Sequence, residues 1–496
     1  MVSNIRRMYL AFSSSDVRPW PTRSPTVPAA EPVFCGITEV AFVQPKNLSS
    51  DRRLFHNGGI CMPTRWRLGA LGLALLASVA IVPLRTAAQG PVTLKYYYPV
   101  GVSGPLNKLM TEMVNDFNGS RPGTHVEPVF AGNYVEAMAK AMTAVMGGTP
   151  PDLAVLDTPE LFSLLDRDAI RPLDDLIAQS GGKAWLDDFY GALLLNARAN
   201  GHIYSIPWQR STPIFYYNRE MFRKAGLDPS QAPKTWTQMV EYAQKLTIRD
   251  ASGNVTQWGV EAPVADTSPW VFQGFLIEAG AKFFDPNGKW VKFNSPEAVR
   301  ALEFILDLQN KYKVHPLGPT SAAFWGQVPQ DFIQQKVAMI YSTTGNMTFI
   351  RTNAKFEWNA GFMPADKQYG APTGGGSFYI FSKIPPDHVA AAWSFIRWMT
   401  EPAQAARWSI GTGYVPIRKT ELSAPPFATY IKEVPQALTA TLQLRVAGEQ
   451  MTIHDVDQIG MMLVTAIQAA QTGRLSAQAA LDQAQRDATA VLAKYQ

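Results

Sequence analysis

Two adjacent pairs of carboxylates are the first candidates for chemistry: Asp174 with Asp175, and Asp187 with Asp188. Paired carboxylates serve general acid–base catalysis when both face one substrate. Side chains of adjacent residues usually point apart, and both pairs occupy positions that suit helix starts or solvated faces. The two pairs therefore favour a structural role over a hydrolytic one.

The other reactive residue types do not form a catalytic or metal-binding pattern. The histidines are scattered and no HExxH spacing occurs, so a metal site is not expected. The run 374–376 is Gly-Gly-Gly but lacks the Lys-Ser or Lys-Thr of a phosphate-binding loop, and GxSxG is absent. Both cysteines, Cys35 and Cys61, precede residue 62. The sequence predicts no catalytic residue, no metal and no cofactor.

Residues 62–88 have the pattern of a secretory signal peptide. Two arginines precede an apolar run over 68–84, and small residues follow at 86–88. The apolar run of about 17 residues is at the short limit for a membrane span. We expect export to the periplasm with cleavage near residue 88, and no membrane insertion afterwards. Residues 1–61 show no sustained period and are expected to be a non-native or unstructured extension, with Met62 as the true start.

Removal of residues 1–88 changes the charge balance. That segment carries ten basic and four acidic residues, so the formal net charge of +5 becomes about −1. The net charge then gives no support to a polyanion-binding surface, and no nucleic-acid partner is expected. The remaining chain is too long for one core and suits two lobes.

Strands and helices alternate along residues 90–496. Strands are expected at 93–100, 124–130 and 151–156, with amphipathic helices at 105–118 and 134–146 between them. This order is typical of βαβ units and a parallel sheet. Later strands are expected at 214–217, 337–341 and 378–381, and later helices at 270–279, 295–310, 390–399 and 458–496.

The stretch STPIFYYNREMFRKAGLDPSQAPKTW, residues 211–236, resembles the signature region of family 1 extracellular solute-binding proteins, the receptors of ABC importers for sugars and related solutes. Similar segments begin at residues 343 (TTGNMTFIRTNAKFEWNAGFMP), 374 (GGGSFYIFSK) and 407 (RWSIGTGYVPI). The family's glycerol-3-phosphate receptors resemble these segments closely. The resemblance implies an α/β, two-lobe periplasmic-binding-protein fold of type II, with parallel-dominated sheets, flanking helices and a cleft between the lobes.

The resemblance also implies how the chain is divided. Lobe 1 would comprise 90–210 and 341–377, and lobe 2 would comprise 211–340 and 378–496. The aromatic residues 215–217 would lie in or beside the hinge, and closure about that hinge would trap the ligand. The implied partners are a small polar solute and the permease subunits of an ABC importer with a separate ATPase.

A receptor for a hydroxylated solute needs aromatic faces and a ring of hydrogen-bonding groups. By resemblance the tyrosines and the Trp would border the solute, a Ser and a Thr-Gly turn would offer polar groups, and a glycine pair would let backbone approach closely. An acidic residue or its neighbour after the third strand would accept from hydroxyls. The ten positions are Tyr134, Asp157, Thr158, Ser211, Trp270, Thr344, Gly345, Gly375, Gly376 and Tyr414.

One departure from the family concerns phosphate. Thr452 stands where the glycerol-3-phosphate receptors carry an Arg, so a charged fork is missing unless Arg445 or another residue supplies it. This favours a neutral polyol, a sugar or a glycerophosphodiester-like solute over glycerol 3-phosphate. A solute sensor that feeds a signalling receptor and a secreted carbohydrate-active enzyme are the alternative functions.

Overall fold

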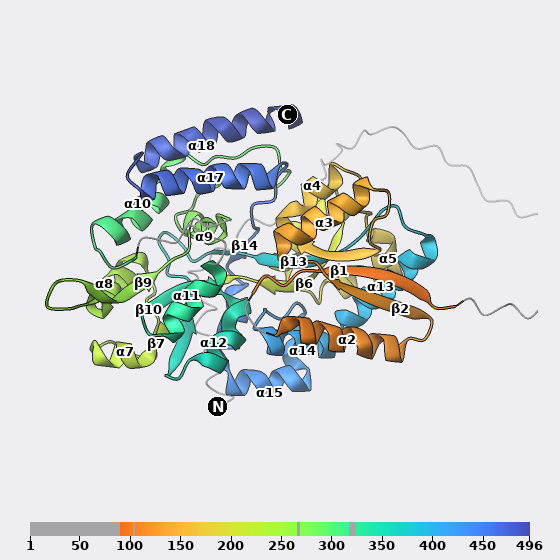
Figure 1. Ribbon diagram of the computed structural model, residues 1–496, viewed down its shortest axis with the longest axis horizontal. Helices are drawn as coiled ribbons and strands as arrows, with labels where there is room; N and C mark the ends of the chain where they lie inside the picture. The colour runs from red at the N-terminus through yellow and green to blue at the C-terminus, as the bar shows by residue number, and fades with distance from the viewer. Residues whose placement is uncertain (1–89, 103–104, 265–267, 317–323) are drawn as a thin grey trace, which may run out of the picture. The chain divides into compact units, whose positions relative to one another are not determined.

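The computed structural model describes residues 90–102, 105–264, 268–316 and 324–496, without the side chains of 324 and 325 (Figure 1). The expected extension over 1–61 and the expected signal peptide over 62–88 lie outside the described residues. Among the described helices, none is both long and apolar enough to cross a bilayer. The same residues contain no group of three or more side chains placed to hold a metal ion.

The first of two five-stranded sheets has the strand order β2-β1-β3-β13-β6. Its strands are β1 (Val92–Tyr98), β2 (Thr124–Phe130), β3 (Leu153–Asp157), β6 (Ser205–Ser211) and β13 (Gly374–Ile380). Strands β2 and β3 run parallel to β1, whereas β13 runs antiparallel to both β3 and β6. Strand β6 therefore forms one edge of this sheet.

Alternate residues of the first sheet enter different cores because strand side chains have a period of two. Leu153 and Val155 join the core that contains α2 (Leu106–Ser120) and α13 (Pro386–Met399). Ala154 and Leu156 join the core on the other face, beneath α3 (Tyr134–Met146). Figure 1 shows α3 and α2 on opposite sides of the sheet.

The second sheet has the order β11-β7-β10-β9-β8. Its strands are β7 (Pro213–Asn218), β8 (Ile248–Arg249), β9 (Val255–Glu261), β10 (Val337–Thr343) and β11 (Trp358–Gly361). Strand β7 pairs antiparallel with β10 and β11, and β9 pairs parallel with β10. Both sheets are thus mixed rather than parallel-dominated, because strands that return from the other half enter them in the opposite direction.

The aromatic run in β7 is core rather than hinge lining. Phe215 and Tyr217 pack into the core beneath α8 (Trp236–Leu246), and Tyr216 packs into the core on the opposite face. All three side chains are fully buried. The Tyr216 hydroxyl donates to the Thr343 carbonyl at 3.0 Å, so even its polar atom is satisfied within the sheet.

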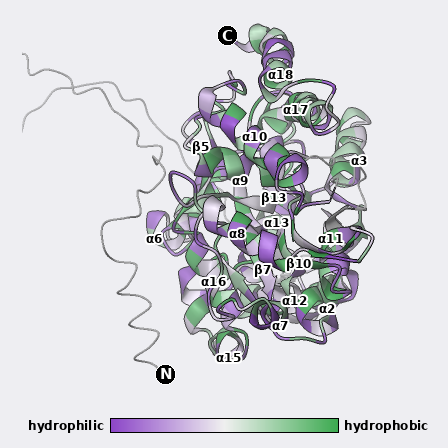
Figure 2. Cartoon of the chain, turned by 90° about the vertical axis from the view of Figure 1, so that its left-hand side faces the viewer, coloured by the Kyte–Doolittle hydropathy of each residue, from purple (hydrophilic) through white to green (hydrophobic). Residues whose placement is uncertain are grey.

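The helices on the second sheet follow the amphipathic pattern. In α8 the buried residues recur every three or four positions, and Thr235 caps the helix by accepting from the Gln238 amide. Figure 2 shows hydrophilic and hydrophobic residues mixed along α8 and α10. The other helices of this group are α9 (Trp270–Glu278), α10 (Pro296–Asn310), α17 (Val456–Gln471) and α18 (Ala477–Leu492).

The remaining elements connect and cover the two sheets. The helices are α4 (Leu161–Leu165), α5 (Asp174–Gln179), α6 (Lys183–Leu186), α7 (Arg219–Lys224), α11 (Phe324–Ile333), α12 (Met347–Asn353), α14 (Pro402–Thr412), α15 (Pro425–Glu433) and α16 (Pro435–Gln443). The short strands are β4 (Arg198–Ala199), β5 (His202–Ile203), β12 (Ala371–Pro372) and β14 (Ala447–Gly448). The 3-10 turns are η1 (Thr158–Glu160), η2 (Gly191–Ala197), η3 (Thr344–Asn346), η4 (Lys419–Ser423) and η5 (Ala493–Tyr495).

The sheets divide the chain differently from the ranges that the sequence suggested. The first crossing agrees, since β6 ends at Ser211 and β7 begins at Pro213. After β10, however, the chain returns to the second sheet as β11 and enters the first sheet only as β13. Helix α13 then contacts β1 and β13, so the segment that begins at 378 first covers the first sheet.

Candidate functional site

A run of three glycines forms the start of β13 beside the edge strand β6. Gly375 lies opposite Arg210, and Gly376 lies between Gln209 on one side and Asp157 on the other. Gly375 has φ +80, and a Cβ there would lie 2.1 Å from the Gln209 carbonyl oxygen. A side chain at this position would be both strained and in collision. The glycine lets two strands approach closely at the point where polar side chains gather.

Tyr134 and Tyr414 meet above this glycine run. Their hydroxyl oxygens lie 3.4 Å apart, and the Gln209 side-chain amide donates to the Tyr134 hydroxyl at 2.8 Å. Tyr134 is the first residue of α3, which Asn133 caps through a capping box. Burial raises the pKa of Tyr414 to about 12 and that of Tyr134 well above its usual range. Both rings therefore carry neutral hydroxyls near pH 7.

Asp157 ends β3 opposite Gly376 and interacts electrostatically with both tyrosines. Its Oδ1 accepts from the Thr158 backbone amide at 3.0 Å. Burial raises the pKa of Asp157 to about 7, although the positive charge of Arg210 opposes the rise. The Thr158 hydroxyl is buried without a partner in the described part of the chain. This end of β3 thus presents a titrating carboxyl and a free hydroxyl.

Ser211, Thr344 and Gly345 lie at the passage between the sheets. Ser211 pairs with Gly374, and the Thr344 amide donates to the Thr212 carbonyl at 3.0 Å. A Cβ on Gly345 would lie 3.3 Å from the Tyr414 ring. The turn after β10 in the second sheet therefore reaches the tyrosine pair of the first.

Trp270 reaches the glycine run from the second half of the protein, the part built on the second sheet. It opens α9, and its Nε1 donates to the Thr373 carbonyl at 2.9 Å. A Cβ on Gly374 would lie 2.5 Å from the indole ring, so only a glycine leaves room for the Trp. The structure brings all ten sequence-predicted positions into one region, linked through β13, the tyrosine pair and the interstrand passage.

A family model for bacterial extracellular solute-binding proteins matches residues 112–435. That match covers more than half of the chain. The chain belongs to this family.

Individual relatives of this solute-binding protein extend the likeness to nearly its whole described length. The sn-glycerol-3-phosphate-binding periplasmic protein UgpB of Escherichia coli is 26% identical over 440 residues, which is 86% of this chain and 96% of the relative. UgpB from Mycobacterium tuberculosis, solved with glycerophosphocholine, has a TM-score of 0.71 at 24% identity and covers 82% of this chain and 99% of its own. A MalE domain from Bdellovibrio bacteriovorus bound to maltotriose gives 0.68 at 18%, covering 81% and 100%. These structures show a type II periplasmic-binding fold.

Arg210 lies within this cluster of the solute-binding protein, although the sequence pattern did not reveal it. Its side chain is fully buried in β6, beside Gly375 and near Asp157. It donates to the Asn196 side chain, which in turn donates to the Thr452 hydroxyl. A buried cation thus lies one side chain away from Thr452, whereas Arg445 is exposed. An arginine directly before the predicted site residue Ser211 was the signal that could have found it.

Further contacts join the two halves of the solute-binding protein beside this cluster. Glu160 from η1 lies near Asp457 at the start of α17, and burial together with the Asp457 charge raises the pKa of Glu160 well above its usual range. His454 contacts Asp166 at 2.8 Å, and its ring stacks on Tyr495. The halves are thus in contact on this side of the glycine run.

The carboxylate pairs considered for catalysis have structural partners instead. Asp175 pairs with Arg171, and Asp187 pairs with Lys183. Asp188 binds Arg418 at 2.6 Å and caps the Thr420 backbone amide. These contacts give the carboxylates structural roles, as the sequence favoured.

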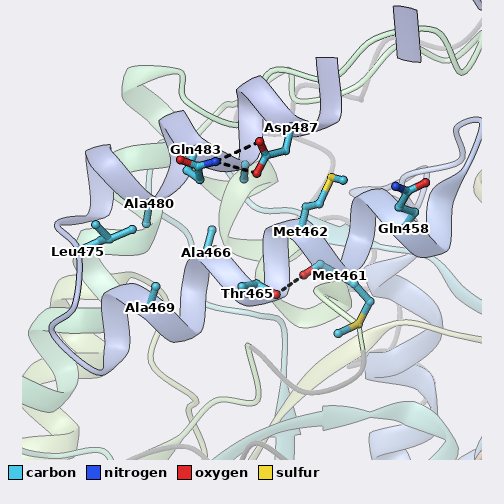
Figure 3. A pocket seen from close by; sticks show the side chains of 11 residues that line it. Gln458, Met461, Met462, Thr465, Ala466, Ala469, Leu475, Ala480, Gln483 and Asp487 are labelled. Atoms are coloured by element: carbon cyan, nitrogen blue, oxygen red, sulfur yellow. Dashed lines mark hydrogen bonds between the residues drawn. The ribbon is translucent and has the colours of Figure 1, made fainter. Parts of the chain in front are cut away.

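An apolar groove lies apart from this cluster, between α17 and α18 (Figure 3). Its volume is ≈ 340 Å³, and Met461 and Leu475 on its wall are exposed. None of its lining residues belongs to the ten predicted positions.

Proposed function

We propose that this protein is the periplasmic solute-binding component of an ABC importer. It captures a small hydroxylated solute between its halves and delivers it to permease subunits that are driven by a separate ATPase. The ligands named for its relatives, glycerol 3-phosphate, glycerophosphocholine and maltotriose, all carry hydroxyl groups. Their shared chemistry supports this class of solute.

The observation that carries the proposal is the convergence of both halves on one glycine run. Tyr134 and Tyr414 come from the side of the first sheet, and Trp270 and Thr344 come from the side of the second. Aromatic rings offer surfaces to the C–H faces of a polyol or sugar, and the hydroxyls and amides around them satisfy its oxygens. Solute bound to both halves would favour the closed arrangement over an open one.

Export fits the same role. The signal-like segment over 62–88 would send the protein to the periplasm, where the solute first becomes accessible. The function needs no cofactor, because binding and closure do the work.

Thermal-shift measurement tests the binding function. We expect at least one solute among glycerol 3-phosphate, glycerophosphocholine, glucose and maltose to raise the melting temperature, since a ligand that binds only the folded form stabilises it. Tyr414→Phe should reduce the shift, whereas Tyr312→Phe, away from the cluster, should not. Loss of solute uptake on deletion of the gene would support the delivery step. Turnover of a bound solute would instead indicate an enzyme.

A further inference from the structure

Arg210 is a fully buried cation on the edge strand of the first sheet. Burial lowers the pKa of its guanidinium to about 10, so the group remains charged near neutral pH. Burial of an ion is costly unless a counter-ion and hydrogen bonds compensate it. The partners of Arg210 therefore indicate whether it is a structural residue or an unfilled binding group.

The hydrogen bonds of Arg210 leave much of its binding capacity unused. Its Nη1 donates to the Gly375 carbonyl and its Nη2 to the Asn196 side chain, both at 3.4 Å, which is long for a charged donor. Its Nε is buried with no partner among the described residues. A guanidinium offers five N–H donors in a planar fork, so several remain available.

No carboxylate within the described ranges forms an ion pair with Arg210. Asp157 interacts with Arg210 electrostatically, but no salt bridge joins the two. Other buried or half-buried arginines of this chain do have such a partner: Arg418 contacts Asp188 at 2.6 Å. Arg210 is thus unlike a cation that holds the fold together.

The surroundings of Arg210 suit a ligand oxygen. Asn196 accepts from the Thr373 hydroxyl at 2.9 Å and donates to Thr452, which fixes its side-chain carbonyl beside the guanidinium. Tyr134 and Asp157 interact electrostatically with the same guanidinium. The cation therefore lies among the residues already assigned to solute.

We propose that Arg210 is a specificity-determining residue whose guanidinium binds an anionic oxygen group of the solute, phosphoryl or carboxylate. This inference rests on the solute-binding function proposed above and names the chemistry of one end of the ligand. The remaining hydroxyls of the solute then fall to the tyrosine pair and the glycine run. The solute is anionic at one end, in contrast to the neutral polyol or sugar that Thr452 alone suggested.

Calorimetric titration of the full chain with matched solutes tests the inference. The pairs are glycerol 3-phosphate with glycerol, for the phosphoryl source, and glucuronate with glucose, for the carboxylate source. We expect one anion to bind about 100-fold more tightly than its neutral partner, the upper range for hydrogen bonds to a charged group. The pair that shows the preference identifies the anion.

Variants of Arg210 separate charge recognition from support of the fold. Arg210→Met should weaken binding of the preferred anion by about 30-fold and change binding of its neutral partner by less than about threefold. Arg210→Lys keeps the charge without the planar fork and should weaken anion binding by about tenfold. Arg121→Met, at an exposed arginine, should leave both affinities unchanged. If the Met variant does not fold, the Lys variant still gives the comparison.

Each result decides the matter. Equal loss of neutral and anionic binding in both Arg210 variants would show that Arg210 only supports the fold. Binding of glucose or maltose without binding of either anion would contradict the inference about Arg210 and leave the solute-binding function intact. Absence of binding in both arms, with maltose and glycerophosphocholine included, would count against both proposals.

Discussion

The hydroxyls of Tyr134 and Tyr414 lie 3.4 Å apart although 280 positions separate them in the chain. One residue opens α3 and the other follows the left-handed Gly413 that ends α14. Gln209 from β6 donates to the Tyr134 hydroxyl, so three distant segments meet at one polar contact. This contact ties helix geometry on both faces of the first sheet to the glycine run of β13.

Removal of either hydroxyl should weaken solute binding without unfolding the protein. Tyr134→Phe and Tyr414→Phe each remove one hydrogen-bonding group, for which we expect about a fivefold loss of affinity and about 1 kcal/mol or less in unfolding free energy. Titration calorimetry of the double variant should show a loss smaller than the sum of the two single losses, because the groups interact. Strict additivity would mean that the two hydroxyls act independently.

Gly375 should be the least replaceable residue of the run. Gly375→Ala combines φ +80 with a Cβ placed 2.1 Å from the Gln209 carbonyl oxygen. We expect a loss of about 3 kcal/mol or more in urea unfolding, or failure to fold. Gly226→Ala is the matched control, because it has φ +70 but open space around its Cβ. Its loss should be about 1 kcal/mol; equal losses would show that steric contact at Gly375 contributes nothing.

The order of strands and helices was largely predictable because it depends on local periodicity. The strand at 124–130 and the helix at 134–146 agree with β2 and α3 at both ends. Strand β13 begins four residues earlier than expected, since glycines oppose strand formation and are tolerated here only for the close approach to β6. Local propensity carries no information about that tertiary contact.

Resemblance named ten positions that the fold brings into one region, whereas residue type alone would not have named them. Tyr134 and Tyr414 read equally well as core tyrosines until the fold brings them together. Arg210 was overlooked because the burial of a charge inside an edge strand depends on β13 and on Asn196, more than ten positions away. The aromatic residues of β7 were assigned to the hinge because of their position along the chain. That position did not reveal that the side chains on both faces of the strand are covered.

Glu261 at the end of β9 should make stability depend on pH. Burial, and then repulsion by Asp331, raises the pKa of Glu261 to about 8 from its ordinary 4.5, whereas Lys336 opposes the rise. Above about pH 4.5 the unfolded chain releases this proton while the folded chain retains it, so this group's contribution to stability falls as pH rises towards 8.

Glu261→Gln should therefore stabilise the protein at pH 8 by an amount on the order of 4 kcal/mol and change stability by less than about 1 kcal/mol at pH 5. Urea unfolding at both pH values measures the difference from the unsubstituted protein, which removes the contribution of the other titrating groups. Glu241→Gln, at an exposed position of α8, should show no such difference between the two pH values. A variant that gains nothing at pH 8 would show that Glu261 is already ionised in the folded state.

Binding of an anionic solute should weaken as Asp157 ionises. Its pKa is raised to about 7 by burial, against the opposing charge of Arg210. The titratable groups that also interact with it electrostatically include Asp457, Glu160, Tyr379 and the two site tyrosines. Glycerophosphocholine is a suitable ligand because its phosphodiester keeps the same charge over this range. We expect about a fivefold weaker affinity at pH 8 than at pH 6, because the ionised carboxyl repels the anion.

Asp157→Asn should abolish this pH dependence and keep the tighter affinity throughout. Asp187→Asn, at an exposed carboxylate paired with Lys183, serves as the control and should retain the fivefold change. Persistence of the change in Asp157→Asn would assign it to another group.

One apolar core contains residues from both sheets: Leu153 and Phe378 belong to the first, and Tyr216 and Ile340 to the second. The chain also passes between the sheets more than once. Each half therefore completes its core with side chains from the other half. A gene fragment that encodes only one half would lack them. The halves should therefore melt together as one cooperative unit, and neither should survive as an excised domain.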